Sequence, residues 1–130
     1  MEQMRVLLVD DEEELVTTLV ERLELRGHAA VGVLTGADAI ARVKEQIFDV
    51  AVLDLRMPGE DGVEIMRRLK RICPGLPIIL LTGHMSEGAS ERGMQAGADD
   101  YLIKPVDIDD LVVKLRQSVA ASRGADGSSR

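Results

Sequence analysis

Five short apolar runs alternate along the chain with longer segments of helical periodicity. Each run is rich in aliphatic and β-branched residues and is bounded by turn residues, so each predicts a β-strand. The runs are Met4–Asp10, Ala29–Leu34, Asp49–Leu55, Leu76–Thr82 and Asp100–Lys104. Most are continuously apolar rather than alternating, which is typical of parallel strands that are covered on both faces.

The segments between the runs have apolar residues at helical spacing. Leu15, Leu19 and Leu23 share one face of the first segment, which ends at Gly27. The last segment follows Asp107, a candidate N-cap. Because parallel strands need crossover helices, the alternation predicts an α/β fold, a single domain built on a doubly wound parallel sheet.

The residues that end the predicted strands are the candidate site residues. A doubly wound sheet binds its ligands at the carboxyl ends of its strands, beside the point where the strand order reverses. The residues at these ends are Asp10, Asp11, Asp54, Thr82 and Lys104. Carboxylates, a hydroxyl and an ammonium group are therefore expected along one edge of the sheet.

Five consecutive acids, Asp10 to Glu14, follow the first apolar run. By themselves they could be an N-cap and a first helical turn, where negative charge suits the helix dipole. Asp54, however, ends the third run, which would lie beside the first in a flavodoxin-like sheet. The converging carboxylates would repel each other unless a cation that prefers oxygen ligands lay between them, and this favours a Mg²⁺ site.

Lys104 ends the fifth run and could by itself be a solvated lysine at a strand end. On the same edge as the carboxylates it has a second interpretation. Together with the hydroxyl of Thr82 it could bind the oxygens of a phosphoryl group carried by Asp54. The pattern of strand ends thus favours phosphoryl transfer onto Asp54.

Composition narrows the classes of function. The 130 residues suit one domain, and the net charge of -7 argues against direct contact with nucleic acid. The single cysteine, Cys73, allows no intramolecular disulfide. Because no apolar run approaches the roughly 20 residues that span a bilayer, and the acidic amino terminus lacks the basic region of a signal peptide, we expect a cytoplasmic protein without membrane contact.

Four separated motifs resemble the receiver domain of bacterial two-component response regulators. They are VLLVDDEEE, DVAVLDLRMPGEDG, PIILLTGH and GADDYLIKP, in this order. The resemblance implies a flavodoxin-like (βα)5 fold with the strand order 2-1-3-4-5 and a receiver domain at residues 1–121. Residues 122–130 are small and polar, which predicts a flexible tail or the start of a linker.

The resemblance also implies a role for each residue of the strand ends. Asp54 is the phosphoacceptor, which takes a phosphoryl group from a sensor histidine kinase or a phosphotransfer protein. Asp11 and Asp54 bind Mg²⁺ directly, together with the backbone carbonyl of Arg56, and Asp10 acts largely through water. Lys104 binds a phosphate oxygen, and the acids Glu12 to Glu14 are interpreted as solvated residues of the first helical turn.

A conformational switch is implied by the same resemblance. The hydroxyl of Thr82 moves toward the phosphoryl oxygens, and Tyr101 changes its rotamer with it, although Tyr101 could also be an ordinary half-buried aromatic. Pro105 is expected to follow a cis peptide bond. Arg56 and His84 flank the path of attacking water and are expected to tune the lifetime of the phosphoryl group.

The segment between the fourth and fifth apolar runs is expected to form a marginal helix. Gly88 and Gly93 lie in it, and each glycine costs a helix about 1 kcal/mol relative to alanine. We expect phosphorylation to bias this helix. With Met85, Met94, the strand Asp100–Lys104 and the last helix, it would form an output surface for an effector domain or a homodimer.

Two alternatives stay open. The chain could be a receiver segment of a larger regulator or hybrid kinase, and nothing in the sequence distinguishes this from a stand-alone regulator. It could instead be a magnesium-dependent hydrolase with an aspartyl-phosphate intermediate, but that class needs a second acid where this chain has Arg56. We expect no enzyme in the ordinary sense, only phosphoryl acceptance and self-dephosphorylation.

Overall fold

The computed structural model describes residues 3–83 and 88–128, so His84 and Met85 lie outside the described residues. The strands are β1 (Arg5–Val9), β2 (Ala29–Val33), β3 (Val50–Asp54), β4 (Arg56–Met57), β5 (Glu60–Asp61), β6 (Ile78–Thr82) and β7 (Asp100–Ile103). The helices are α1 (Glu13–Leu25), α2 (Gly36–Glu45), α3 (Gly62–Ile72), α4 (Ala89–Gln95) and α5 (Ile108–Ser128). Within the described residues no helix combines the length and the apolar character that crossing a membrane requires.

The main sheet confirms the predicted topology. Its five strands have the order β2-β1-β3-β6-β7, and all neighbours are parallel. Because β6 and β7 are the fourth and fifth strands of this sheet, the order is the expected 2-1-3-4-5. The short strands β4 and β5 form a separate antiparallel pair around Pro58 and Gly59.

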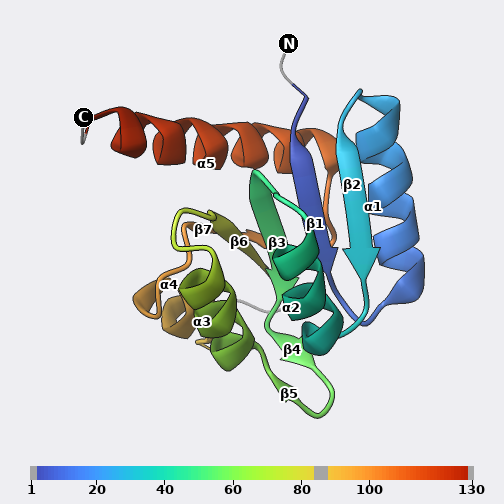
Figure 1. Cartoon of the computed structure of the whole chain (residues 1–130). Coiled ribbons are helices and arrows are strands. Elements are labelled where there is room, and N and C mark those ends of the chain that lie inside the picture. Colours follow the sequence, from blue (N-terminus) through green and yellow to red (C-terminus); the bar gives the residue numbers. More distant parts are fainter. Residues whose placement is uncertain (1–2, 84–87, 129–130) are drawn as a thin grey trace.

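The helices cover the sheet in two layers. α1 and α5 lie on one face, and α2, α3 and α4 lie on the other (Figure 1). Alternate residues of a strand point to opposite faces, so Leu7 belongs to one apolar cluster and Leu8 to the other. The sheet is therefore the middle layer of a three-layer structure.

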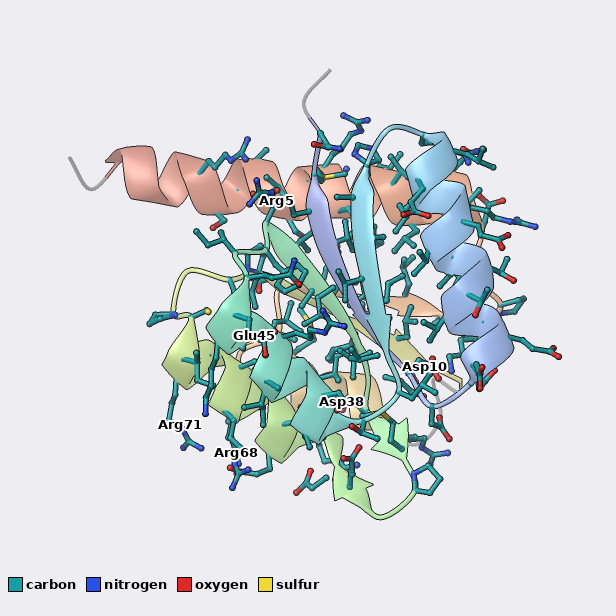
Figure 2. The ribbon with its side chains drawn as sticks, turned by 45° about the vertical axis from the view of Figure 1, so that its right-hand side comes forward. Arg5, Asp10, Asp38, Glu45, Arg68 and Arg71 are labelled. Atoms are coloured by element: carbon teal, nitrogen blue, oxygen red, sulfur yellow. The ribbon has the colours of Figure 1, made fainter. Side chains whose placement is uncertain are left out.

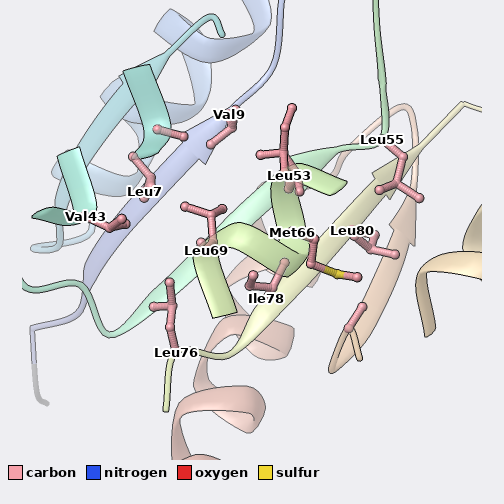
Figure 3. Packing of buried hydrophobic residues seen from close by; sticks show 14 of the residues in the cluster. Leu7, Val9, Val43, Leu53, Leu55, Met66, Leu69, Leu76, Ile78 and Leu80 are labelled. Atoms are coloured by element: carbon pink, nitrogen blue, oxygen red, sulfur yellow. The ribbon is translucent and has the colours of Figure 1, made fainter. Parts of the chain in front are cut away.

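The central strands are buried on both faces. Figure 3 shows Leu53, Ile78 and Leu80 of β3 and β6 packed against Met66 and Leu69 of α3. All five side chains are fully buried, and each such side chain contributes about 1.5–3 kcal/mol relative to an exposed one. This packing fixes the positions at which the strands end.

Aspartate side chains cap the starts of two helices, and Asp107 is the N-cap that the sequence predicted. The side chain of Asp61 accepts hydrogen bonds from the amides of Val63 and Glu64 at the start of α3. Asp107 accepts two amide hydrogen bonds from the first turn of α5, at 2.8 and 3.2 Å. Each aspartate satisfies amides that have no partner within the helix.

The segment that follows residue 121 is helical in the structure. α5 continues to Ser128, beyond the position at which we expected a flexible tail or the start of a linker to begin. The hydroxyl of Ser122 donates to the carbonyl of Gly75 at 3.0 Å, and Arg123 pairs with Asp49 at 3.4 Å. These two contacts hold the continuation against the amino ends of the strands, and no proline interrupts it.

We expected the two glycines near α4 to lie inside the helix and weaken it, and the structure shows a different role for each. Gly88 is the residue before the helix, with a positive φ of 67°, and is not inside it. Gly93 is inside the helix, but a Cβ there would collide with the side chain of Leu80 and lie 3.1 Å from that of Leu55. Gly93 therefore allows α4 to approach the sheet closely.

We expect Gly62→Ala to destabilise the protein by about 1–3 kcal/mol, the usual cost of overpacking. A Cβ on Gly62 would lie 2.5 Å from the Cα and carbonyl oxygen of Leu55, and these backbone atoms cannot rotate away. Gly124→Ala is the control, because its Cβ would meet no atom within 4 Å and should stabilise α5. Urea unfolding of the two variants measures the difference, and equal effects would contradict this account.

Candidate functional site: carboxylates and a lysine at the carboxyl edge of the sheet

The carboxyl ends of the strands bring the predicted site residues together. Asp10 follows β1, Asp54 ends β3 and Lys104 follows β7. β1 lies directly beside β3, with Val9 opposite Leu53. Figure 2 shows Asp10 at this edge of the sheet, near the start of α1.

Three acids form a group that could hold a cation. Asp10, Asp11 and Asp54 each offer a carboxylate oxygen within 4.8 Å of the other two. Asp10 and Asp54 are 2% and 4% exposed, whereas Asp11 is open to solvent. Oδ1 of Asp54 accepts a hydrogen bond from the amide of Arg56 at 2.9 Å, and the buried Oδ2 of Asp10 lies 2.8 Å from the ammonium group of Lys104. The three carboxylates carry more negative charge than one lysine neutralises, and a hard cation would offset the excess.

Lys104 is surrounded by carboxylates. Its Nζ lies 2.8 Å from Oδ2 of Asp10, 2.9 Å from Oε1 of Glu12 and 3.3 Å from Oδ2 of Asp54. The contacts with Glu12 and Asp54 have hydrogen-bond geometry. Burial alone would lower the pKa of Lys104, but the carboxylates of Asp10, Glu12 and Asp54 outweigh it and raise the pKa above its ordinary value.

The carboxyl group of Asp54 is harder to ionise than an ordinary aspartate. Burial raises its pKa, and the hydrogen bond from the amide of Arg56 opposes this effect. The negative charge of Asp10 raises the pKa further, while Lys104 lowers it. Because the net direction is upward, a cation at this edge would stabilise the ionised form that a nucleophile needs.

Thr82 occupies the expected place between the acceptor and the lysine. It ends β6, the strand between β3 and β7, and its side chain is buried. Its carbonyl accepts a hydrogen bond from the amide of Lys104 at 2.8 Å. The strand that carries Asp54 and the one that leads to Lys104 therefore both adjoin the strand of Thr82.

Tyr101 lies in β7 opposite Leu80, two positions before the partner of Thr82. Its side chain is half-buried and packs against the cluster under α2 and α3. Nζ of Lys114 lies 5.9 Å from the centre of its ring and pairs with Asp100 at 2.9 Å. The aromatic ring thus lies between the sheet and a cation of α5.

Two further predicted residues, Arg56 and Pro105, lie around this edge. The peptide bond between Lys104 and Pro105 is cis, as expected. Arg56 is exposed at the start of β4, directly after the loop from the acceptor strand. His84, the other residue expected to tune the phosphoryl lifetime, lies outside the described residues.

Glu12 is the site residue that sequence reasoning missed. We interpreted Glu12, Glu13 and Glu14 together as solvated, and all three are in fact exposed to some degree. Glu12 nevertheless reaches across the edge to Lys104. Its position was the available signal, because it is the last residue before α1 and lies two residues from Asp10, whose Oδ1 accepts its amide hydrogen bond at 2.9 Å.

The arrangement suits the transfer of a phosphoryl group. A buried carboxylate is positioned beside a lysine that can bind phosphate oxygens, with further acids able to hold a cation. Phosphoryl transfer requires little from a protein beyond such positioning and the neutralisation of charge. A hollow of about 580 Å³, lined by Glu12, Lys104 and Pro105 among others, opens beside the cluster between α1 and the residues after β7.

This chain matches a known family model and is similar in sequence to known regulatory proteins. The family model described as the response regulator receiver domain matches residues 6–116. The transcriptional regulatory protein TctD of Salmonella typhimurium (strain LT2) is 37% identical over 121 residues, which are 93% of this chain and 54% of that protein. The transcriptional regulatory protein ZraR of Klebsiella oxytoca is 34% identical over 122 residues, which are 94% of this chain and 28% of that protein.

A solved structure extends the comparison to the fold. The CheY-like response regulator receiver domain protein from Methanospirillum hungatei JF-1 superposes with a TM-score of 0.88 at 27% identity. The match covers 95% of this chain and 99% of that one, whereas the chain spans little more than half of TctD and under a third of ZraR. Since the family model covers most of the sequence, and the sheet and its edge agree with it, this chain belongs to the response regulator receiver domain family.

Proposed function

We propose that Asp54 accepts a phosphoryl group from a phosphohistidine of a sensor histidine kinase or phosphotransfer protein. The observation that carries this proposal is the position of Asp54, buried at the end of β3 with its Oδ2 3.3 Å from Nζ of Lys104. A carboxylate that is buried beside a cation and two other acids has an environment suited to receiving a phosphoryl group.

In the transfer, an oxygen of Asp54 forms a bond to phosphorus while the bond from phosphorus to the donor's imidazole nitrogen breaks. Lys104 donates to a phosphoryl oxygen and offsets its charge. Water later cleaves the acyl phosphate, which releases inorganic phosphate and returns the carboxylate, with Arg56 and His84 tuning the rate. The chain's own residue is the acceptor, so the domain acts as a signalling module and not as an enzyme that turns over a substrate.

Mg²⁺ is the proposed cofactor. Asp10, Asp11, Asp54 and the backbone carbonyl of Arg56 would hold it, and the excess of clustered carboxylates over the single Lys104 supports this assignment. Oxygen-only ligands suit this hard cation. When bound, it would neutralise charge on the phosphoryl oxygens.

Phosphorylation would be reported through Thr82 and Tyr101 to the output surface, which we define as α4, β7 and α5. Among the described residues of these elements, three large apolar side chains are exposed: Met94, Ile103 and Val113. β7 is an edge strand of the sheet, so this surface is open to a partner. An effector domain or a second copy of the chain is the proposed partner.

The proposal places the domain in the cytoplasm, where it requires no direct contact with nucleic acid or membrane. Its net charge of -7 agrees with the absence of direct contact with nucleic acid. A receiver segment of a larger regulator or hybrid kinase is compatible with the partial coverage of TctD and ZraR. The hydrolase alternative is not favoured, because position 56 supplies an exposed arginine in place of the second acid.

We expect the protein to gain one phosphoryl group when it is incubated with acetyl phosphate and magnesium. The gain should disappear in Asp54→Ala and when magnesium is removed, and it should persist in Asp38→Ala, an exposed acid at the start of α2. Intact mass spectrometry measures the gain. Its absence in a folded wild-type protein would overturn the proposal.

We expect Asp54→Asn to stabilise the metal-free protein at pH 7 by about 1–2 kcal/mol, since removing a poorly compensated buried charge is commonly favourable. The folded-state pKa of Asp54 is raised, so the folded protein binds the proton more tightly and wild-type stability falls as the pH rises through that pKa. The extra stability of Asp54→Asn should therefore vanish under acidic conditions, below the pKa that Asp54 has in the unfolded chain.

Urea unfolding in EDTA from about pH 3 to pH 8, a range that extends below the ordinary pKa of an aspartate, measures this dependence. Adding magnesium should stabilise the wild type more than Asp54→Asn, because the variant lacks one of the proposed carboxylate ligands. A variant that is less stable than the wild type at pH 7 without metal, or that gains equally from magnesium, would contradict the assignment.

A further inference from the structure

The contacts of Lys104 raise a problem for the proposed function. An ammonium group has three N–H donors, and carboxylate oxygens of Asp10, Glu12 and Asp54 already lie within 3.3 Å of its nitrogen. The Lys104 side chain is only 17% exposed, so most of its surface already contacts other atoms. A phosphoryl oxygen can approach Nζ only if one of the three carboxylates gives way.

The three carboxylates differ in how easily they can leave. Asp54 carries the phosphoryl group and so remains beside it. The side chain of Asp10 is only 3% exposed, so its carboxylate cannot move into solvent. The side chain of Glu12 is 60% exposed, and the hollow of about 580 Å³ lies beside it, so its carboxylate can move into water at little cost.

We propose that Glu12 is a positioning residue that holds Lys104 in the unphosphorylated protein and is displaced from it by the incoming phosphoryl group. This inference rests on the proposed function and adds a residue to it. No covalent change is involved, because Lys104 exchanges one hydrogen bond to Glu12 for one to a phosphoryl oxygen. Glu12 thereby competes with the phosphoryl group and limits how readily the domain accepts it.

The backbone around Glu12 makes this exchange local. The side chain of Glu12 makes no capping hydrogen bond to α1, so its movement leaves the helix start intact. Its amide stays bound to Oδ1 of Asp10, so the main chain keeps its place at the site. Substitution of the side chain should therefore change the exchange without unfolding the domain.

The test compares initial rates of phosphorylation by acetyl phosphate, with magnesium, by intact mass spectrometry. Glu12→Gln and Glu12→Asp should both accept the phosphoryl group about two- to fivefold faster than the wild type, the factor that corresponds to a partly exposed ion pair. Glu12→Asp keeps the charge but is one methylene too short to keep the contact. Glu13→Gln removes an equal charge from the next residue and should change the rate much less.

A second measurement separates competition from a merely structural role. Calorimetric titration with beryllium fluoride and magnesium, a non-covalent probe of the phosphoryl position, should show tighter binding in both Glu12 variants by a similar factor. Magnesium alone should bind Glu12→Asp as it binds the wild type. A structural role would weaken binding and slow the reaction.

The outcomes distinguish the two proposals. If the wild type gains a phosphoryl group and both Glu12 variants react at the wild-type rate or more slowly, the inference about Glu12 is wrong and the function of Asp54 stands. Equal acceleration in Glu13→Gln would also overturn it, because general charge would then explain the effect. If the folded wild type gains nothing, the proposed function and this inference both fail.

Discussion

The packing of like charges against a single lysine at one sheet edge is the constraint on which the rest of the structure depends. Asp10 and Asp54 end neighbouring strands whose side chains are buried on both faces, so neither carboxylate can move away from the other. Lys104 is brought to them from the far side of β6. Close backbone packing of Gly62 on Leu55 fixes the loop directly after the acceptor.

This constraint connects stability with function. Negative charge is in excess at this site: three carboxylates surround Lys104, and burial and the charge of Asp10 raise the pKa of Asp54. A bound cation would offset this excess, and an incoming phosphoryl group would then change the contacts of Lys104. A switch follows naturally, because a change of partner at Lys104 affects β7, the strand that also carries Tyr101.

Much of this architecture could be predicted from the sequence, because it depends on the residues that end apolar runs. The alternation of strands and helices, and the expectation that Asp10, Asp54 and Lys104 lie at one edge, follow from that pattern. The strand order was implied by the resemblance to receiver domains. The contact of Glu12 could not be predicted, since it depends on a side-chain conformation across the edge. The continuation of α5 was also missed, because contacts of Ser122 and Arg123 outweigh the small, polar composition of that segment.

The central claim is that Asp54, and no other acid of the edge, carries the phosphoryl group. Borohydride reduction of the phosphorylated protein followed by peptide mass spectrometry tests it most directly, because the reagent converts an aspartyl phosphate to homoserine and leaves free carboxylates unchanged. We predict homoserine at position 54 and intact aspartate at positions 10 and 11. Homoserine at either of those positions, with Asp54 unmodified, would contradict the account.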